Sequence, residues 1–555
     1  MPPLDWNGLM ERRNLATYLF AFLLLVGNAI QPDIVLAYEA NASIDEQIQK
    51  GAELEKDQQW GEALTHYEEA IREFPNNKTL SKRLKITRLH FDLERRYADK
   101  SYLSILRATS ESMAMELTGE VLMKIESHYY QPPNWNSILR RGTTGLKIAL
   151  LSEEFGRQNR LHVTHDQIDT VIRTIWNAQI RRDFRSRQQA QDFIQWAAQT
   201  TRRTTGLFTS STILEYMCCA AASLDTYSTY LTGDQLDEVY SQIEGNFVGL
   251  GIELKADKGS LLIAHVISKG PADRSGIHKG DRIVEVDGHS TKDISTDKAA
   301  DMLKGEQGSY VKVAVLGTDG QLRQLFIRRE RVEVPSVEDV KIVDRQHGIA
   351  YIKINSFQKN TSDDVYTALR SLHRQGMRKL IVDVRGNPGG LLTQSVEVAD
   401  YFVRGGTIVQ TRGRSSRENY AYKAHLDGTW RVPLVVLIDR DSASASEIFA
   451  GAIRDNRAGK VVGERSYGKG SVQGIFPLRS VKAGVRLTTA KFFSPADKAI
   501  SLAGVEPDIV VRPQTVLRPS GEDDVASDDR DLILAAGIDT ARNLMARDSR
   551  WKQGR

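Results

Sequence analysis

Residues 433–448 read PLVVLIDRDSASASEI, and this stretch decides how the second half of the chain is interpreted. Its apolar run does not alternate with polar residues, which is typical of a strand buried on both faces. Three serines follow in a short polar turn, and Ser444 with Glu447 forms a capping-box pattern at a helix start. A serine at such a helix start lies beside backbone amides that can stabilise an oxyanion. Taken alone, the stretch also fits an ordinary capped helix.

A second stretch, GERSYGKGSVQG at residues 463–474, contains Lys469 among glycines and small residues. No histidine follows His425, so a serine nucleophile here needs another base, and lysine is the known substitute. Burial must then lower the pKa of Lys469, whose immediate sequence neighbours carry no carboxylate. Gln473 lies an even number of residues further on. In an extended strand the two side chains share a face, which predicts that the Gln473 amide oxygen orients the lysine.

Together the two stretches resemble the carboxyl-terminal processing (tail-specific) serine peptidase family, whose pattern is Ser-Ala-Ser-Ala-Ser-Glu followed by Gly-Lys-Gly-x-Val-Gln. The family's spacing between serine and lysine, 25 residues, selects Ser444 as the nucleophile. The resemblance implies a Ser-Lys dyad with Gln473 as a third catalytic residue. It also assigns one oxyanion amide to Gly390, the final glycine of the loop at residues 385–390, and the second to Ala445. No metal or cofactor is expected.

Residues 336–513 are expected to form the catalytic core. Strand and helix patterns alternate there, which indicates a layered α/β fold. The strands are expected at residues 349–354, 380–384 and 433–438 and the helices at 361–372 and 392–402. By resemblance this is a ClpP/crotonase-like α/β peptidase core. Residues 514–555 are expected to form an acidic linker and a C-terminal helix, 532–546, that packs back or supports self-association.

Residues 246–331 resemble a PDZ domain, on the segments FVGLGIEL at 247–254 and GPADRSGIHKGDRI at 270–283. Gly249 and Gly251 let successive amides converge on one point, which makes a nest for a terminal carboxylate. An edge strand over Leu250–Leu254 can pair with an extended peptide. The predicted binding site for free C-termini comprises Gly249, Leu250, Gly251 and Ile252, and a different β-rich domain is the alternative.

The beginning of the chain has the pattern of a secretory signal peptide, assigned to residues 1–37. Two arginines precede an apolar run at 15–26, and small residues at 35–37 offer a cleavage site. An uncleaved anchor is the alternative, although the run is shorter than the roughly 20 residues of a spanning helix. In either case the protein is expected to be exported to the periplasm or cell envelope, with membrane association through residues 15–30.

Two helical regions follow. Residues 44–100 are interpreted as a tetratricopeptide-like segment, because the small and large residues from Gly51 to Pro75 are spaced as in a tetratricopeptide unit. An adaptor protein is the hypothetical partner of this segment. An ordinary helical hairpin is the alternative interpretation. Residues 101–245 form a helical domain with Cys218 and Cys219 on a buried helix. Within it, LDTYSTYL at 224–231 resembles the segment that precedes the PDZ domain in this family, except that Thr226 stands where proline is usual. The fold class is therefore multidomain α+β.

Composition excludes several other functions. The 555 residues, 41% of them hydrophobic, suffice for several cores, and 75 basic against 71 acidic residues indicate no nucleic-acid partner. Two adjacent cysteines exclude a zinc site and a disulfide framework. Residues 463–469 nearly match a phosphate-binding loop, but Gly470 stands where a hydroxyl would bind magnesium. No Gly-x-Ser-x-Gly motif occurs, which excludes the α/β-hydrolase plan.

The expected function is a serine endopeptidase that cleaves exported proteins near their C-terminus after the PDZ domain binds the substrate tail. The alternative is a catalytically inactive scaffold that binds protein C-termini through its PDZ and tetratricopeptide-like segments.

Overall fold

The computed structural model describes residues 32–257, 260–292, 294, 296–425, 429–512 and 531–544. The apolar run at 15–26 and most of the predicted signal peptide lie outside these residues. In the part of the chain that is described, no helix is both long and apolar enough to cross a membrane. The chain divides into two compact units, residues 1–95 and 96–555.

The first unit is helical, with α2 (Pro32–Lys56), α3 (Trp60–Glu73) and the greater part of α4 (Lys78–Ala98). Its core contains Ala63, Tyr67, Ala70 and Leu80, all buried. A methyl group added at Gly51 would come within 2.3 Å of the Tyr67 ring, so the glycine permits close packing of these helices. Small residues therefore face large ones as the sequence pattern indicates, while the tetratricopeptide assignment stays a prediction.

The second unit begins with a helical domain whose central helix is α11. Its helices are α5 (Lys100–Ala108), α6 (Glu111–His128), α7 (Trp135–Leu151), α8 (Glu153–Gln158), α9 (His165–Ile180), α10 (Arg187–Thr205), α11 (Thr209–Ala222) and α12 (Gly233–Glu244). Cys218 and Cys219 are buried free thiols on α11, so the predicted buried helix is confirmed. Glu215 of α11 is fully buried and pairs with Arg96 at 2.6 Å.

The PDZ region consists of a two-stranded ribbon and a larger antiparallel sheet. The ribbon pairs β2 (Asn246–Gly249) with β9 (Glu330–Glu333). The larger sheet has the order β3-β4-β5-β7-β8, with β6 on β5. Its elements are β3 (Ile252–Asp257), β4 (Ser260–Val266), α13 (Pro271–Arg274), β5 (Arg282–Val286), β6 (His289–Ser290), α14 (Thr296–Leu303), β7 (Tyr310–Leu316) and β8 (Leu322–Arg328).

The edge strand expected over Leu250–Leu254 starts later, at Ile252, so the prediction of its beginning was wrong. The reason is that the carbonyl of Leu250 accepts from Ala272 N and that of Gly251 from Ile267 N, which bends the chain into a turn. Gly251 has φ 78°, which favours glycine there. β3 still forms one edge of the sheet.

The predicted catalytic core is built on a six-stranded sheet of order β10-β11-β12-β15-β16-β19, in which all neighbours are parallel except β10 and β11. Its strands are β10 (Val337–Asp344), β11 (Ile349–Ile354), β12 (Lys379–Asp383), β15 (Leu434–Ile438), β16 (Lys460–Gly463) and β19 (Ile509–Val510). Three helices alternate with them, α15 (Thr361–Arg374), α16 (Leu392–Asp400) and α17 (Ala445–Asp455). The expected strands and helices of the core are confirmed to within a few residues.

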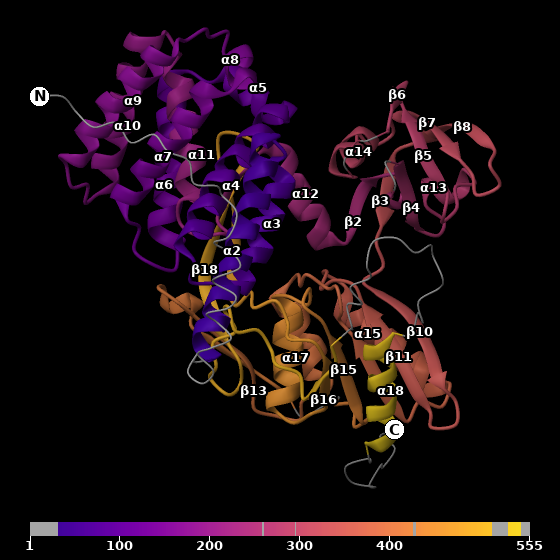
Figure 1. Ribbon diagram of the computed structural model, residues 1–555. Helices are drawn as coiled ribbons and strands as arrows, with labels where there is room; N and C mark the ends of the chain where they lie inside the picture. Colours follow the sequence, from indigo (N-terminus) through magenta and orange to yellow (C-terminus); the bar gives the residue numbers. More distant parts are fainter. Residues whose placement is uncertain are drawn as a thin grey trace, which may run out of the picture. The chain divides into compact units, whose positions relative to one another are not determined.

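Both faces of this sheet are covered. Val436 and Ile438 of β15 join the core formed with α15, α16 and α17, whereas Val435 and Leu437 join a second core with α18 (Leu532–Asn543). In Figure 1, α17 and α18 lie against the sheet that contains β15 and β16. This double coverage explains why residues 434–438 are apolar without alternation.

A second sheet adjoins the catalytic loops. Its order is β1-β18-β13-β14, with β17 also paired to β18. Its elements are β1 (Thr229–Leu231), β13 (Thr407–Gly413), the short helix η1 (Ser416–Glu418), β14 (Tyr420–Lys423), β17 (Ser471–Pro477) and β18 (Gly484–Phe493). Because β1 lies between α11 and α12 of the helical domain, its pairing with β18 brings residues 229–231 to this sheet.

The C-terminal helix α18 is attached to the sheet at both ends. Asp531 caps its first turn by accepting from Leu534 N at 2.9 Å, and both Asp531 oxygens accept from Arg385 at 2.7 Å. At the other end, Lys379 Nζ donates to the carbonyls of Ala541 and Arg542, each at 2.7 Å. The helix stops at Asn543, earlier than the expected residue 546.

We predict that Asp531→Ala destabilises the core, because it removes both the cap of α18 and one of the two carboxylates that Arg385 bonds. The expected loss is about 1–2 kcal/mol in the free energy of unfolding, measured by urea denaturation. Asp539→Ala on the same helix is the control, since Asp539 pairs with the exposed Arg542 at the surface and its loss should change stability by less than about 0.5 kcal/mol. Equal effects of the two substitutions would contradict the attachment of α18 through Asp531.

Candidate active site

Ser444 lies in the turn between β15 and α17, immediately before the helix begins. Its φ of 54° and ψ of −110° fall outside the regions that L-residues ordinarily occupy. Such strain persists only where the surrounding contacts impose it, and it is concentrated at functional positions. The turn thus presents Ser444 at the positive end of the α17 dipole.

The two neighbouring serines hold the turn in place. Ser442 Oγ donates to the carbonyl of Val384 at 2.8 Å, and Ser446 Oγ donates to that of Asn387 at 3.0 Å. Both serines are fully buried. They therefore fasten the turn to the loop after β12.

Glu447 accepts four hydrogen bonds and joins the serine turn to the lysine loop. Its Oε2 accepts from Ser444 N at 2.8 Å and from Lys469 N at 2.9 Å. Its Oε1 accepts from Ser466 Oγ and from Gly468 N, each at 2.6 Å. The capping-box pattern predicted only the bond to Ser444 N. The other three span about twenty residues of sequence, and no local pattern indicates them.

The contacts of Glu447 are those of an ionised carboxylate. Ser466 Oγ accepts from Val505 N at 2.7 Å, so its own proton is directed to Glu447, and the other three partners are amide donors. Burial raises the pKa of Glu447, while these hydrogen bonds oppose the change. Four donors with no acceptor favour the charged form of this fully buried side chain.

Lys469 has the lowered pKa that a general base requires. Burial and the neighbouring Arg486 guanidinium lower the pKa of Lys469 to about 8, against the opposing charge of Glu447. The sequence neighbours of Lys469 carry no carboxylate, but Glu447 approaches it from another part of the chain. The Lys469 Nζ lies 5.1 Å from the centre of the Tyr227 ring.

The serine, the lysine and the glutamine are not connected by hydrogen bonds. Among the described residues, none joins Lys469 Nζ to Ser444 Oγ or to the Gln473 side chain; Gln473 Nε2 instead donates to the carbonyl and hydroxyl of Ser471. Lys469 and Gln473 do not share one strand face as predicted, because Lys469 precedes β17 and a register shift separates Val472 from Gln473. The catalytic role of Gln473 stays a prediction.

The expected oxyanion amides lie next to the nucleophile turn. A methyl group added at Gly389 would come within 2.8 Å of Ser444 Cβ and 2.9 Å of Ala445 N, so the glycine loop packs directly on the turn. Gly390 has φ 136°, and a methyl group there would come within 2.1 Å of the Phe357 carbonyl oxygen. Among the described residues no hydrogen bond uses the amide of Gly390 or of Ala445. Both are therefore available as donors.

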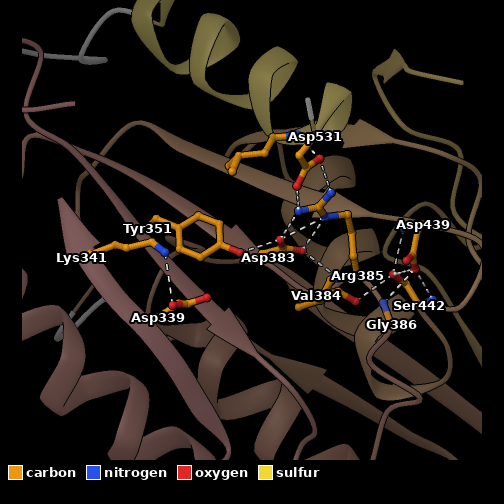
Figure 2. Close-up of polar contacts among 11 residues, drawn as sticks. Asp339, Lys341, Tyr351, Asp383, Val384, Arg385, Gly386, Asp439, Ser442 and Asp531 are labelled. Carbon is orange, nitrogen blue, oxygen red and sulfur yellow. Dashed lines mark hydrogen bonds and ion pairs between the residues drawn. The ribbon is translucent and has the colours of Figure 1, made fainter. Parts of the chain in front are cut away.

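A polar network fixes the start of the glycine loop (Figure 2). Arg385 lies between Asp383 and Asp531 and bonds to both carboxylates. Asp383 also accepts from Tyr351 Oη at 2.8 Å, and Asp439 accepts from Gly386 N at 3.0 Å. The loop is thus held from both sides, by α18 and by the nucleophile turn.

Two of the predicted peptide-binding residues lie at or next to the open edge of the PDZ sheet, since Ile252 begins the edge strand β3 and Gly251 precedes it. Gly249 instead ends β2, where it pairs with Glu330 of β9. Leu250 is buried and Gly251 is in the turn before β3, so these residues offer backbone groups rather than side chains. Helix α14 packs against β3. An edge strand beside a helix is the arrangement that binds an added peptide strand.

Comparison with known proteins gives matches over the PDZ region and the core. The sequence model of peptidase family S41 matches residues 348–511, and that of the PDZ domain matches 239–316. A carboxy-terminal-processing protease of Bartonella bacilliformis is 35% identical over 297 residues, which cover 52% of this chain and 67% of that protein. A probable CtpA-like serine protease of Staphylococcus epidermidis is 32% identical over 291 residues, covering 52% of this chain and 58% of that protein.

Among solved structures, the photosystem II D1 C-terminal processing protease is similar with a TM-score of 0.40 and 24% identity, covering 73% of this chain and 94% of that one.

We predict that peptide cleavage rises with pH through the pKa of Lys469. Below that pKa the amine is protonated and cannot accept the serine proton, so kcat/KM should increase and level off above an apparent pKa of about 8. The profile is measured with a peptide substrate from roughly pH 6 to 10. Activity already at its plateau near pH 6, or a limb at the ordinary lysine pKa near 10, would contradict this assignment.

We further predict that Glu447→Gln lowers kcat by at least about tenfold, because an amide cannot accept from all four donors and the turn and the lysine loop would separate. Removing the negative charge should also lower the pKa of Lys469 and move the acidic limb to lower pH. Glu506→Gln serves as the control, since Glu506 pairs with Arg465 at the surface. A Glu447→Gln enzyme with unchanged kcat and limb would show that the carboxylate does not support the site.

Proposed function

The chain belongs to peptidase family S41, and on that premise we propose that it is a serine endopeptidase with Ser444 as nucleophile and Lys469 as general base. One observation carries the proposal. The amides of Ser444 and Lys469 both donate to the same oxygen, Glu447 Oε2, so a buried carboxylate holds the two reacting residues at one place. The lowered pKa of Lys469 supplies the neutral amine that the reaction needs.

In the proposed reaction, neutral Lys469 takes the proton of Ser444 Oγ as the oxygen attacks the peptide carbonyl. The oxyanion of the tetrahedral intermediate accepts from the amides of Gly390 and Ala445, each contributing roughly 3–4 kcal/mol to transition-state stabilisation on precedent. The Lys469 ammonium then protonates the leaving amine as the C–N bond breaks. Water, deprotonated by Lys469, releases the acyl group from Ser444.

Substrate selection is proposed to begin at the PDZ domain. A substrate tail would extend the sheet along β3, with its terminal carboxylate at the turn containing Gly249 and Gly251. The substrates are therefore protein chains with free, apolar C-termini. Export to the periplasm or cell envelope is part of the proposal and rests on the pattern of the first 37 residues.

The second candidate function, an inactive scaffold that binds C-termini, is distinguished by chemistry. The scaffold needs only the PDZ edge. It gives no reason for a strained Ser444 beside a lysine whose pKa is lowered to about 8, and these two features favour the enzyme.

We predict that the full-length chain cleaves an unstructured protein with an apolar C-terminal tail, and that Ser444→Ala reduces this cleavage by about four orders of magnitude or more. Ser446→Ala is the matched control, because it removes a neighbouring hydroxyl and should retain cleavage with a stability loss of about 1 kcal/mol. Amidation of the substrate's C-terminus should raise KM by weakening capture of the tail. The measurement is product formation followed by mass spectrometry.

Cleavage by Ser444→Ala at the wild-type rate would show that Ser444 is not the nucleophile. Binding of tail peptides without cleavage of any of them would favour the scaffold.

A further inference from the structure

The ring of Tyr227 lies beneath the amine of Lys469, 5.1 Å from Nζ to the ring centre. This distance is within the range of a cation–π contact, which stabilises the protonated amine. Proton transfer from Ser444 requires Nζ within roughly 2.6–3.2 Å of Oγ. Among the described residues no hydrogen bond joins these two atoms, so the contact that Lys469 makes is with the aromatic ring rather than with the nucleophile.

Tyr227 is held firmly in its position by the turn that contains it. Asp225 Oδ1 accepts from Tyr227 N and from Ser228 N, each at 2.8 Å. Ser228 Oγ accepts from Thr488 N of β18 at 3.1 Å, and β1 pairs with β18 immediately afterwards. Tyr227 therefore belongs to a turn, residues 225–228, that is fixed to β18, whereas Lys469 has a long side chain with several rotatable bonds.

Arg486 of β18 interacts both with the turn of Tyr227 and with Lys469. Its Nε donates to the carbonyl of Tyr227 at 3.0 Å, and its charge is one of those that face Lys469. The other is the Glu447 carboxylate on α17. Between a repelling guanidinium and an attracting carboxylate, the electron-rich ring face offers the amine a defined alternative to the serine.

We propose that Tyr227 is a positioning residue that holds the Lys469 amine on its ring and away from the Ser444 hydroxyl until a substrate is bound. The inference rests on the proposed Ser444–Lys469 chemistry and adds a means by which the site stays inactive without substrate. When a substrate binds at the Ser444 turn, the amine leaves the Tyr227 ring and forms the hydrogen bond with Ser444 Oγ that proton transfer requires. Basal reactivity of Ser444 is therefore limited by the strength of the contact with the ring.

The test measures how fast a small fluorophosphonate, used without a peptide tail, reacts with the full-length chain. Ser444 Oγ bonds to phosphorus, fluoride leaves, and the serine proton passes to Lys469. Tyr227→Phe provides the reference, and ring-fluorinated phenylalanines at position 227 then keep the ring in place while weakening its negative face. We expect the reaction rate to rise stepwise with fluorination, by roughly threefold to tenfold in total. The acidic limb of its pH profile should move to lower pH, since Arg486 and Glu447 are unchanged.

Fluorination of the ring at position 130 is the matched control, because Tyr130 lies 5.3 Å from Lys491 Nζ and takes no part in the reaction. That series should leave the rate unchanged. Tyr227→Leu, which removes the ring altogether, should accelerate the reaction as well.

A rate that does not change on fluorination at position 227 would overturn the proposal, because the ring would then not retain the amine. A falling rate would also overturn it, since the ring would then support the productive position of Lys469. These outcomes are distinct from failure of the proposed function, in which the wild-type chain would not react at Ser444 and the inference would fall with it.

Discussion

The site depends on one buried carboxylate. Glu447 is fully buried, and such a charge is tolerated only where hydrogen bonds replace its lost hydration. The donors that satisfy it come from the nucleophile turn and from residues 466–469, so the same bonds that stabilise the charge also set the distance between these segments. Val505 N extends the connection to the segment before β19 by donating to Ser466 Oγ.

This arrangement places a base and its electrostatic opponents close together. Burial and Arg486 favour the neutral amine of Lys469, whereas Glu447 and the Tyr227 ring favour the ammonium. In the proposed mechanism, a pKa of about 8 lets Lys469 accept the serine proton and later donate it to the leaving amine. A fully apolar environment would lower the pKa of Lys469 further and make it a weaker base in the first step, so in the proposed mechanism the balance of opposing charges serves both halves of the reaction.

The sequence allowed prediction of features with local signals. The unalternating apolar run indicated β15, the glycines marked the tight loops, and the resemblance selected Ser444 and Lys469 as site residues. The sequence did not predict the remaining partners of Glu447, the approach of Tyr227 or the contact of Arg385 with Asp531, because these join segments up to 242 residues apart. The expected alignment of Gln473 with Lys469 failed for a local reason as well, since a register shift within β17 breaks the two-residue period.

The most direct test of the account is to locate the acyl group during turnover. The reaction with a peptide ester is quenched in acid, and the modified residue is identified by mass spectrometry of the digested protein. If Ser444 is the nucleophile and Lys469 its base, the wild-type chain carries an acyl group on Ser444 and Lys469→Ala carries none. An acyl group on Ser442 or Ser446 instead, or acylation of Lys469→Ala at the wild-type rate, would contradict this assignment.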